Sequence, residues 1–145
     1  MTALARRTLV TGMAGLPLAA VLADPRLAAM AADSLETVTT KTSDGREERA
    51  ALALPAKTPA AAVLLVHEWW GLNDQIKSMA AELANNGFVA LAVDLYEGKV
   101  AKDPGTAKTL MDGVDPARAI ATLNAWVAWL KADKRSTGKV ATIGW

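Results

Sequence analysis

Three apolar runs along the chain have the pattern of buried strands. Residues 61–66 read AAVLLV, residues 88–93 read FVALAV, and residues 139–145 read KVATIGW. Continuous apolar runs of this length, bounded by polar or turn-forming residues, are typical of strands that a parallel sheet buries on both faces. The pattern therefore predicts three parallel strands in the part of the chain that follows residue 60.

A different pattern precedes these runs. Residues 36–42 alternate and are rich in β-branched side chains, and Asp44-Gly45 is a strong turn signal. Residues 50–54 then form a second short apolar run before Pro55. Two such segments on either side of a turn predict a β-hairpin.

Between the runs, apolar positions recur at helical spacing. Asn73 or Asp74 begins a helix that ends at Asn85-Asn86-Gly87, and a short helix is expected over residues 106–111. Asp115-Pro116 begins a third helix, which runs to about Ala132. The inward positions of this helix are expected to be Ile120, Leu123, Val127 and Leu130, with Trp126 and Trp129 on its flanks.

The resulting order is a hairpin followed by β-α-β-α-β. Right-handed crossovers place the last three strands in one parallel sheet with helices on both faces. The predicted fold class is therefore α/β, in a single domain that spans residues 32–145.

Residues 1–31 have the form of an export signal. Arg6-Arg7 precede an apolar stretch from Leu9 to Ala23, and Ala29-Met30-Ala31 fits a cleavage site. The paired arginines indicate a twin-arginine signal peptide, which implies the twin-arginine export machinery as a partner and a periplasmic or extracellular location in a bacterium. The apolar stretch is shorter than the ~20 residues of a spanning helix, so no permanent membrane anchor is expected. The alternative is an amphipathic N-terminal helix of the domain.

The composition argues against several classes of function. The net charge is +1 and no basic stripe is present, so nucleic acid is not an expected partner. There is no cysteine and one histidine, His67, which leaves no thiolate site and no set of histidines for a metal. His67-Glu68 is not a zinc-protease motif, because Gly71 stands where that motif needs a histidine. Neither a metal nor an organic cofactor is expected.

Candidate chemistry gathers where the parallel strands end. In open parallel sheets a ligand binds beyond the carboxyl ends of the strands. The segment His67-Glu68-Trp69-Trp70-Gly71 follows the first parallel strand, and Asp94 follows the second. The first turn lacks the G-x-G-x-x-G glycines of a dinucleotide site, and its two tryptophans would block a phosphate. A nucleotide- or flavin-binding module is therefore disfavoured.

The segment VHEWWGLNDQIKSMAAELANNGFVALAVDLYEGKVA, together with the closing IGW, resembles the dienelactone hydrolase family of α/β-hydrolases. The resemblance runs from about Val63 to Trp145. It implies that the chain is the N-terminal part of an α/β-hydrolase sheet, truncated before the nucleophile elbow, the sharp strand-to-helix turn that carries the nucleophile. Gly144-Trp145 would open that turn, and the family's cysteine would be residue 146. The family's acid and histidine would follow later, so the chain as given is expected to be inactive.

The resemblance also implies roles for residues that are present. Glu68 matches the glutamate that takes part in activating the cysteine, and the backbone N–H of Trp69 matches a donor of the oxyanion hole. Trp70, Tyr96 and Lys99 would line the substrate pocket. Lys99 would be a weaker cation than the arginine that well-studied members carry soon after D-L-Y, because it lacks the bidentate fork.

Two further polar residues are expected to be structural. His67 precedes Glu68 at the end of its strand and is expected to be packed and hydrogen-bonded rather than catalytic. Asp94 is expected to hold the loop that follows it through hydrogen bonds to the backbone.

Two functions remain open. The first is a hydrolase of ester or lactone bonds whose full-length form uses a Cys-His-Asp mechanism on a small-molecule substrate. The alternative is a non-catalytic exported α/β protein that binds a small ligand, and the identity of residue 146 separates the two. A parallel sheet cut after a central strand exposes an apolar edge, so the isolated 145-residue chain is expected to aggregate or remain molten.

Overall fold

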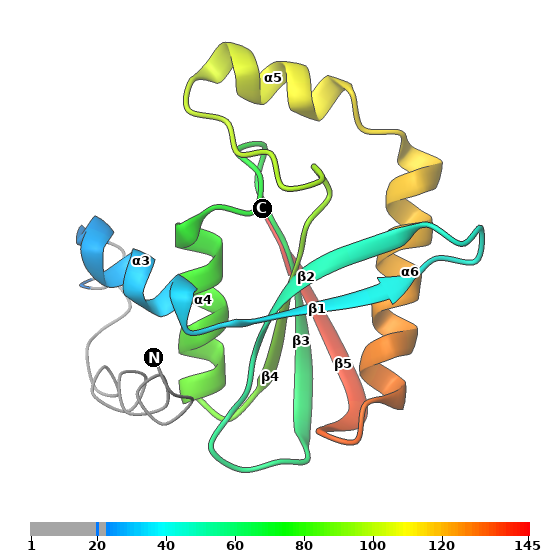
Figure 1. The fold of residues 1–145 in the computed structure, drawn as a ribbon. Coiled ribbons are helices and arrows are strands. Elements are labelled where there is room, and N and C mark those ends of the chain that lie inside the picture. The colour runs from blue at the N-terminus through cyan, green and yellow to red at the C-terminus, as the bar shows by residue number, and fades with distance from the viewer. Residues whose placement is uncertain (1–19, 21–22) are drawn as a thin grey trace.

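A mixed five-stranded sheet forms the centre of the molecule, in the order β1-β2-β4-β3-β5 (Figure 1). The computed structural model describes residue 20 and residues 23–145. The strands are β1 (Glu36–Lys41), β2 (Glu47–Ala53), β3 (Ala60–Val66), β4 (Val89–Val93) and β5 (Ser136–Gly144). This arrangement confirms the predicted α/β fold class.

The strand pairing also follows the prediction. β1 and β2 form an antiparallel hairpin, and β2 pairs antiparallel with β4. β3 pairs in parallel with β4 on one side and with the edge strand β5 on the other. The second hairpin strand begins at Glu47, earlier than the apolar run at 50–54 suggested, because polar residues of β2 continue the ladder opposite β1.

Three helices connect the parallel strands, namely α4 (Asp74–Asn85), α5 (Pro104–Asp112) and α6 (Pro116–Ala132). Each begins at a polar cap whose side chain accepts a backbone N–H: Asn73 for α4, Asp103 for α5 and Asp115 for α6. The predicted starts of α4 and α6 are confirmed. α5 begins two residues before the expected helix, because Asp103-Pro104 is itself a cap followed by a first-turn proline.

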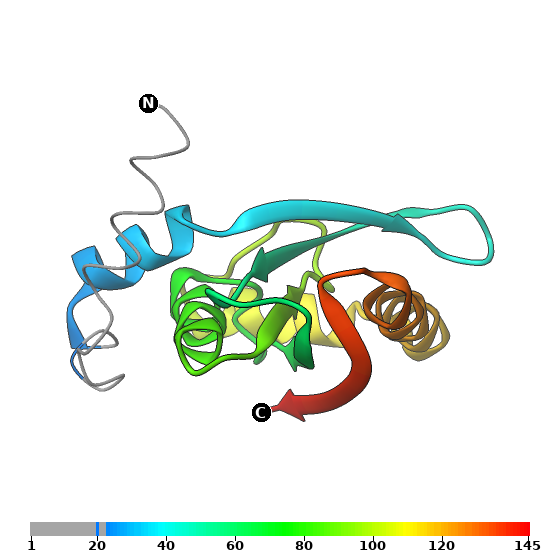
Figure 2. The ribbon, with the colours of Figure 1, turned by 90° about the horizontal axis from the view of Figure 1, so that it is seen from below.

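The two faces of the sheet are packed with side chains of different size. α4 and α6 lie on opposite sides of the twisted sheet (Figure 2). The α6 side is built from large residues, whose buried members include Leu52, Leu64, Val89, Leu91, Val93, Trp126 and Leu130. The α4 side is built mostly from alanines, with Ala51, Ala53, Ala80, Ala84, Ala90 and Ala92 beside Leu65 and Ile76. The small side chains let α4 approach the sheet closely.

The buried face of α6 differs from the expected one. Trp126 is fully buried in the core, whereas the sequence placed it on a flank, and Ile120 is 60% exposed although it was expected to point inward. The helix is turned so that Thr122, Trp126 and Leu130 form its buried row. A large indole fills the space above the sheet better than the smaller side chains beside it, and burial of that surface sets the rotation.

A further helix, α3 (Pro25–Asp33), packs against α4 at the edge of the molecule (Figure 1). Its buried side chains are Ala28, Ala31 and Ala32, so it overlaps the expected cleavage region at 29–31. The rest of the predicted export signal, residues 1–19 with 21 and 22, lies outside the described residues. Among the helices that are described, none is long and apolar enough to cross a membrane.

Candidate functional site

The carboxyl ends of β3 and β5 lie side by side. In the parallel register Val66 is level with Gly144, and a Cβ atom built on Gly144 would be 3.5 Å from the Cβ of Val66. Glu68 follows Val66 by two residues, and Trp145 follows Gly144 directly. The two strands therefore deliver Glu68 and the chain beyond Gly144 to the same edge of the sheet.

His67 connects the ends of β3 and β4. Its side chain is buried, and its Nε2 atom accepts the backbone N–H of Leu95 at 3.1 Å. Nδ1 therefore carries the proton and donates it to the carbonyl oxygen of Glu68 at 2.7 Å. Burial lowers the pKa of His67 below its usual value, which favours this neutral form. The prediction that His67 is packed and hydrogen-bonded is confirmed.

Asp94 organises the loop after β4. Its Oδ1 atom accepts the N–H of Tyr96 at 2.9 Å, and its Oδ2 atom accepts the N–H of Gly98 at 2.5 Å. These are the backbone hydrogen bonds expected for this residue. They turn the chain sharply, and Glu97 adopts a left-handed conformation with a φ of 56°.

The loops after β3 and β4 touch at Gly71. This residue has a φ of 91°, and a Cβ atom placed on it would lie 2.5 Å from the carbonyl oxygen of Lys99. A backbone hydrogen bond of 2.9 Å from the N–H of Ala101 to the carbonyl of Trp70 joins the same two loops. Only glycine fits this position, so Gly71 sets how closely the two loops approach.

Glu68, Trp69 and Trp70 follow His67 in the loop after β3. The Glu68 side chain is half-buried, and its carboxylate has no hydrogen-bond or ion-pair partner among residues 23–145. Trp69 is 37% exposed, and its ring packs edge-on against that of Trp70 with 5.1 Å between centroids. The backbone N–H groups of both tryptophans make no hydrogen bond within the same described range.

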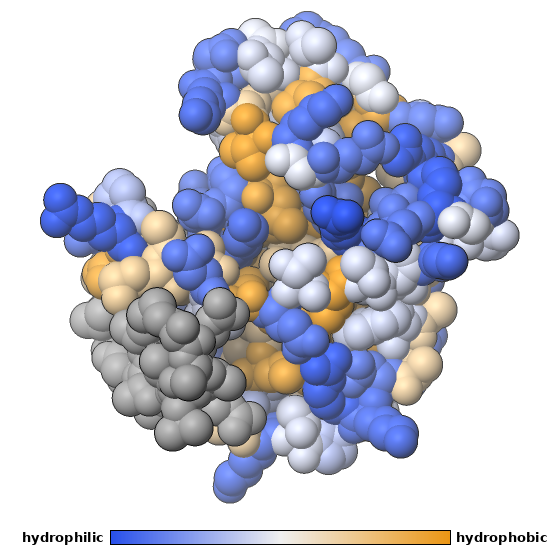
Figure 3. Space-filling model, in the orientation of Figure 1, coloured by the Kyte–Doolittle hydropathy of each residue, from blue (hydrophilic) through white to orange (hydrophobic). Residues whose placement is uncertain are grey.

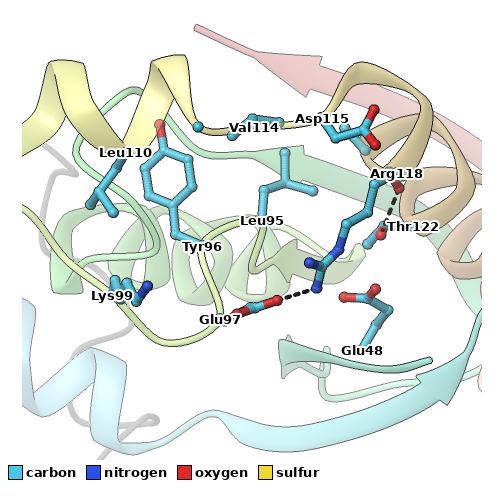
Figure 4. A pocket seen from close by; sticks show the side chains of 12 residues that line it. Glu48, Leu95, Tyr96, Glu97, Lys99, Leu110, Val114, Asp115, Arg118 and Thr122 are labelled. Atoms are coloured by element: carbon cyan, nitrogen blue, oxygen red, sulfur yellow. Dashed lines mark hydrogen bonds and ion pairs between the residues drawn. The ribbon is translucent and has the colours of Figure 1, made fainter.

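A cavity of about 170 Å³ lies on the other side of the second loop, between that loop, β2, α5 and α6 (Figure 4). Tyr96 and Lys99 are among its lining residues, whereas Glu68, Trp69 and Trp70 are not, so this cavity differs from the predicted substrate pocket. In the space-filling view, apolar surface continues from α5 toward the body of the molecule (Figure 3). The complete lining is Glu48, Leu95, Tyr96, Glu97, Lys99, Leu110, Gly113, Val114, Asp115, Arg118, Ala119 and Thr122.

The sequence did not indicate Glu48 or Arg118 as members of a site. Glu48 lies in the hairpin strand β2, and Arg118 lies in the first turn of α6, where a charged residue is ordinary. Arg118 pairs with Glu97, which is 21 positions away in the chain. No short-range pattern signals such a pair. Within the described ranges, no group of histidine, cysteine, aspartate or glutamate residues is arranged to hold a metal ion.

Comparison with known proteins assigns the chain to a family. The sequence model of the Dienelactone hydrolase family matches residues 49–145, which is most of the described chain. The chain belongs to the dienelactone hydrolase family.

Individual relatives agree with this assignment. A protein of Saccharolobus solfataricus is 54% identical over 54 residues, which cover 37% of this chain and 21% of the relative. The carboxymethylenebutenolidase of Pseudomonas putida is 25% identical over 122 residues, which cover 76% of this chain and 50% of the relative. The chain therefore spans at most about half the length of these two relatives.

The fold is shared with solved structures. A crystal structure of a Klebsiella pneumoniae protein superposes with a TM-score of 0.64 at 24% sequence identity, covering 77% of this chain and 50% of that one. At this identity the likeness shows the fold alone. It confirms that the five strands of this chain are arranged as in the α/β-hydrolase sheet.

Proposed function

We propose that the whole protein of this dienelactone hydrolase family member hydrolyses ester or lactone bonds of small molecules through a Cys-His-Asp mechanism. Family membership supports a hydrolase. The observation that carries the finer proposal is the register of β3 and β5, which brings Glu68 and the chain after Gly144 to one edge of the sheet. In the proposal, the cysteine follows Trp145 in the whole protein, and the acid and histidine come later still.

In this mechanism the thiolate of the cysteine attacks the carbonyl carbon, and the carbonyl oxygen becomes an oxyanion. The N–H of Trp69 donates to this oxyanion together with the N–H of the residue after the cysteine. Support comes from the N–H of Trp69, which has no partner within the described residues. The histidine protonates the leaving oxygen, and water then attacks the thioester, which releases the acid and restores the thiol.

Glu68 is proposed to take part in activating the cysteine. A half-buried carboxylate that has no partner within the described residues is available to accept or hold a thiol proton. His67 is excluded from this role, because both of its ring nitrogens are already committed to the loop backbone.

The test is steady-state hydrolysis of 4-nitrophenyl acetate by the protein expressed from its complete gene. Glu68→Gln is expected to lower kcat/KM by about 10²-fold to 10⁴-fold, as loss of a positioned proton-transfer group does. Glu47→Gln is the matched control, because Glu47 is an exposed residue of β2 outside the cavity. Equal activity of the Glu68→Gln and Glu47→Gln variants would refute the role of Glu68.

The non-catalytic alternative, an exported binder of a small ligand, is not favoured by the family match. Sequencing the gene beyond codon 145 would distinguish this binder from the enzyme. Cysteine or serine directly after Trp145 supports hydrolysis, and any other residue supports a binder. The same reading tests the proposal that this chain is the N-terminal part of a longer protein.

We also propose that residues 1–31 direct the folded protein through the twin-arginine pathway to the periplasm or beyond. The support is the sequence itself, with Arg6-Arg7 ahead of the apolar stretch. Replacing both arginines by lysine is expected to leave the protein inside the bacterium, as cell fractionation would show. Arg26→Lys is the control, because Arg26 lies beyond the apolar stretch. Unchanged export of the double variant would contradict the assignment.

A further inference from the structure

The cavity beside Tyr96 has the size of a small-molecule site. Its volume of about 170 Å³ is similar to that of an engineered cavity that accepts a benzene molecule, about 150 Å³. Apolar side chains come from the second loop and from α5 and its C-terminal end, with Leu95, Leu110 and Val114 among them (Figure 4). A ligand with a small ring or a short chain therefore fits the space.

Tyr96 offers this cavity a hydrogen-bond donor. The residue is 8% exposed, and its hydroxyl has no hydrogen-bond partner within residues 23–145. Its ring is fixed between the edge of His67, with 4.6 Å between centroids, and Gly71. The hydroxyl oxygen is not among the fully buried atoms of the described residues, so water reaches it, and a ligand oxygen in the cavity would replace that water as its acceptor.

Glu48 offers the cavity an acceptor. This carboxylate is 6% exposed and lines the cavity from β2. Within the described part of the chain, its side chain contacts one cation, Arg46, whose Nη1 donates to Oε1 at 2.9 Å. One carboxylate oxygen is thus engaged, and the other remains to accept a hydroxyl group of a ligand.

The charges around the cavity balance. Three carboxylates, Glu48, Glu97 and Asp115, stand beside three cations, Arg46, Lys99 and Arg118. Arg118 is paired with Glu97, which the left-handed turn after Asp94 holds in place. An anionic ligand would have to compete with Glu97 for Arg118, and a cationic ligand would have to compete with Arg46 for Glu48.

We propose that this cavity binds a small uncharged molecule that carries hydroxyl or carbonyl oxygens. Tyr96 supplies the donor, Glu48 supplies the acceptor, and the Glu97–Arg118 pair selects against charge.

Three ligands of similar size test the charge preference. Benzyl alcohol, benzoate and benzylamine are titrated at pH 7 into the protein expressed from its complete gene, and dissociation constants are measured by ligand-observed NMR. Benzyl alcohol is expected to bind at least tenfold more tightly than the benzoate anion or the benzylammonium cation. Tighter binding of either ion, or no binding of benzyl alcohol, would overturn the proposal.

Two variants test the named contacts. Tyr96→Phe keeps the ring and removes the hydroxyl. It is expected to weaken the binding of benzyl alcohol about three- to tenfold, the effect of one neutral hydrogen bond. Glu97→Gln removes the charge that pairs with Arg118 and is expected to strengthen the binding of benzoate by a similar factor. Glu47→Gln, which breaks the exposed pair with Arg49, is the control for the second variant and should change neither constant. Unchanged constants in both test variants would refute the assignment of these contacts.

Hydrolysis assays separate this proposal from the proposed function. If benzyl alcohol binds as described and no ester or lactone is hydrolysed, the cavity assignment stands and the hydrolase proposal fails. If esters are hydrolysed and benzyl alcohol does not bind, the hydrolase proposal stands and the cavity assignment fails.

Discussion

Replacing Gly71 by alanine tests whether the contact between the two loops determines their arrangement. The added Cβ atom would lie 2.5 Å from the carbonyl oxygen of Lys99 and 3.1 Å from a ring carbon of Tyr96. The first of these is a backbone atom, so the two loops must move apart. Overpacking of this kind costs about 1–3 kcal/mol, and a non-glycine residue in a left-handed conformation adds about 1–2 kcal/mol. We expect a total loss of about 2–5 kcal/mol.

Gly87→Ala is the matched control. Gly87 has a φ of 93°, close to the 91° of Gly71, but a Cβ atom placed there would have nothing within 4 Å. The control therefore carries the same conformational strain without the clash. Alanine also lowers the conformational entropy of the unfolded chain, which stabilises the folded state by about 0.4–1 kcal/mol and offsets part of the strain at both sites. The difference between the two variants isolates the contact with Lys99.

The measurement is urea denaturation of the protein expressed from its complete gene, with free energies of unfolding compared at equal m-values. Gly71→Ala is expected to be less stable than Gly87→Ala by about 1–3 kcal/mol. Benzyl alcohol binding should also weaken in Gly71→Ala, because Tyr96 lies against the added methyl group. Equal stability of the two variants, within about 0.5 kcal/mol, would show that the close approach of the loops is not a constraint.

Three further predictions concern individual side chains, and the last includes a control substitution. Burial holds the pKa of His67 below 6.5, so the folded protein binds fewer protons than the unfolded chain as the pH falls below that value, and its stability declines there. Between about pH 7.5 and about pH 5, the free energy of unfolding of His67→Gln should fall less than that of the unsubstituted protein. An equal dependence of this free energy on pH in both proteins would argue against a neutral buried imidazole. Asp94→Ala leaves two backbone N–H groups without their acceptor, which should cost about 1–3 kcal/mol and speed hydrogen exchange of the Gly98 amide. Leu64→Ala should cost about 2–5 kcal/mol in urea, whereas Ile120→Ala on the exposed side of α6 should stay within about 0.5 kcal/mol.

The sequence predicts the strands and helices well because each carries a local signal. The apolar runs correspond to β3, β4 and β5, and the polar caps Asn73 and Asp115 begin α4 and α6. The crossover rule then fixes the parallel part of the sheet. The roles of His67 and Asp94 could be predicted for a similar reason, since each bonds to backbone atoms at or near a strand end.

The remaining features depend on contacts between distant parts of the chain. The rotation of α6 follows from how Trp126 packs on β1 and the central strands, and helical spacing alone does not choose between neighbouring faces. The cavity needs side chains from β2, the loop after β4, and α6. Its Glu97–Arg118 pair spans 21 positions. A sequence pattern limited to one element contains no information on such contacts.

The alanine-rich packing between α4 and the sheet makes the two layers respond differently to substitution. On the side of Leu64 and Trp126, a smaller residue leaves a hole that neighbouring groups partly fill, so damage stays local. On the side of Ala80, Ala84 and Ala92, a larger residue has no void to enter, and the entire helix must be lifted. Asn73, the residue that caps the amino end of α4, comes just after the loop that carries Trp69 and Trp70. A single added methylene beneath that helix would therefore displace the loop that carries Trp69 and Trp70 as well as lower stability.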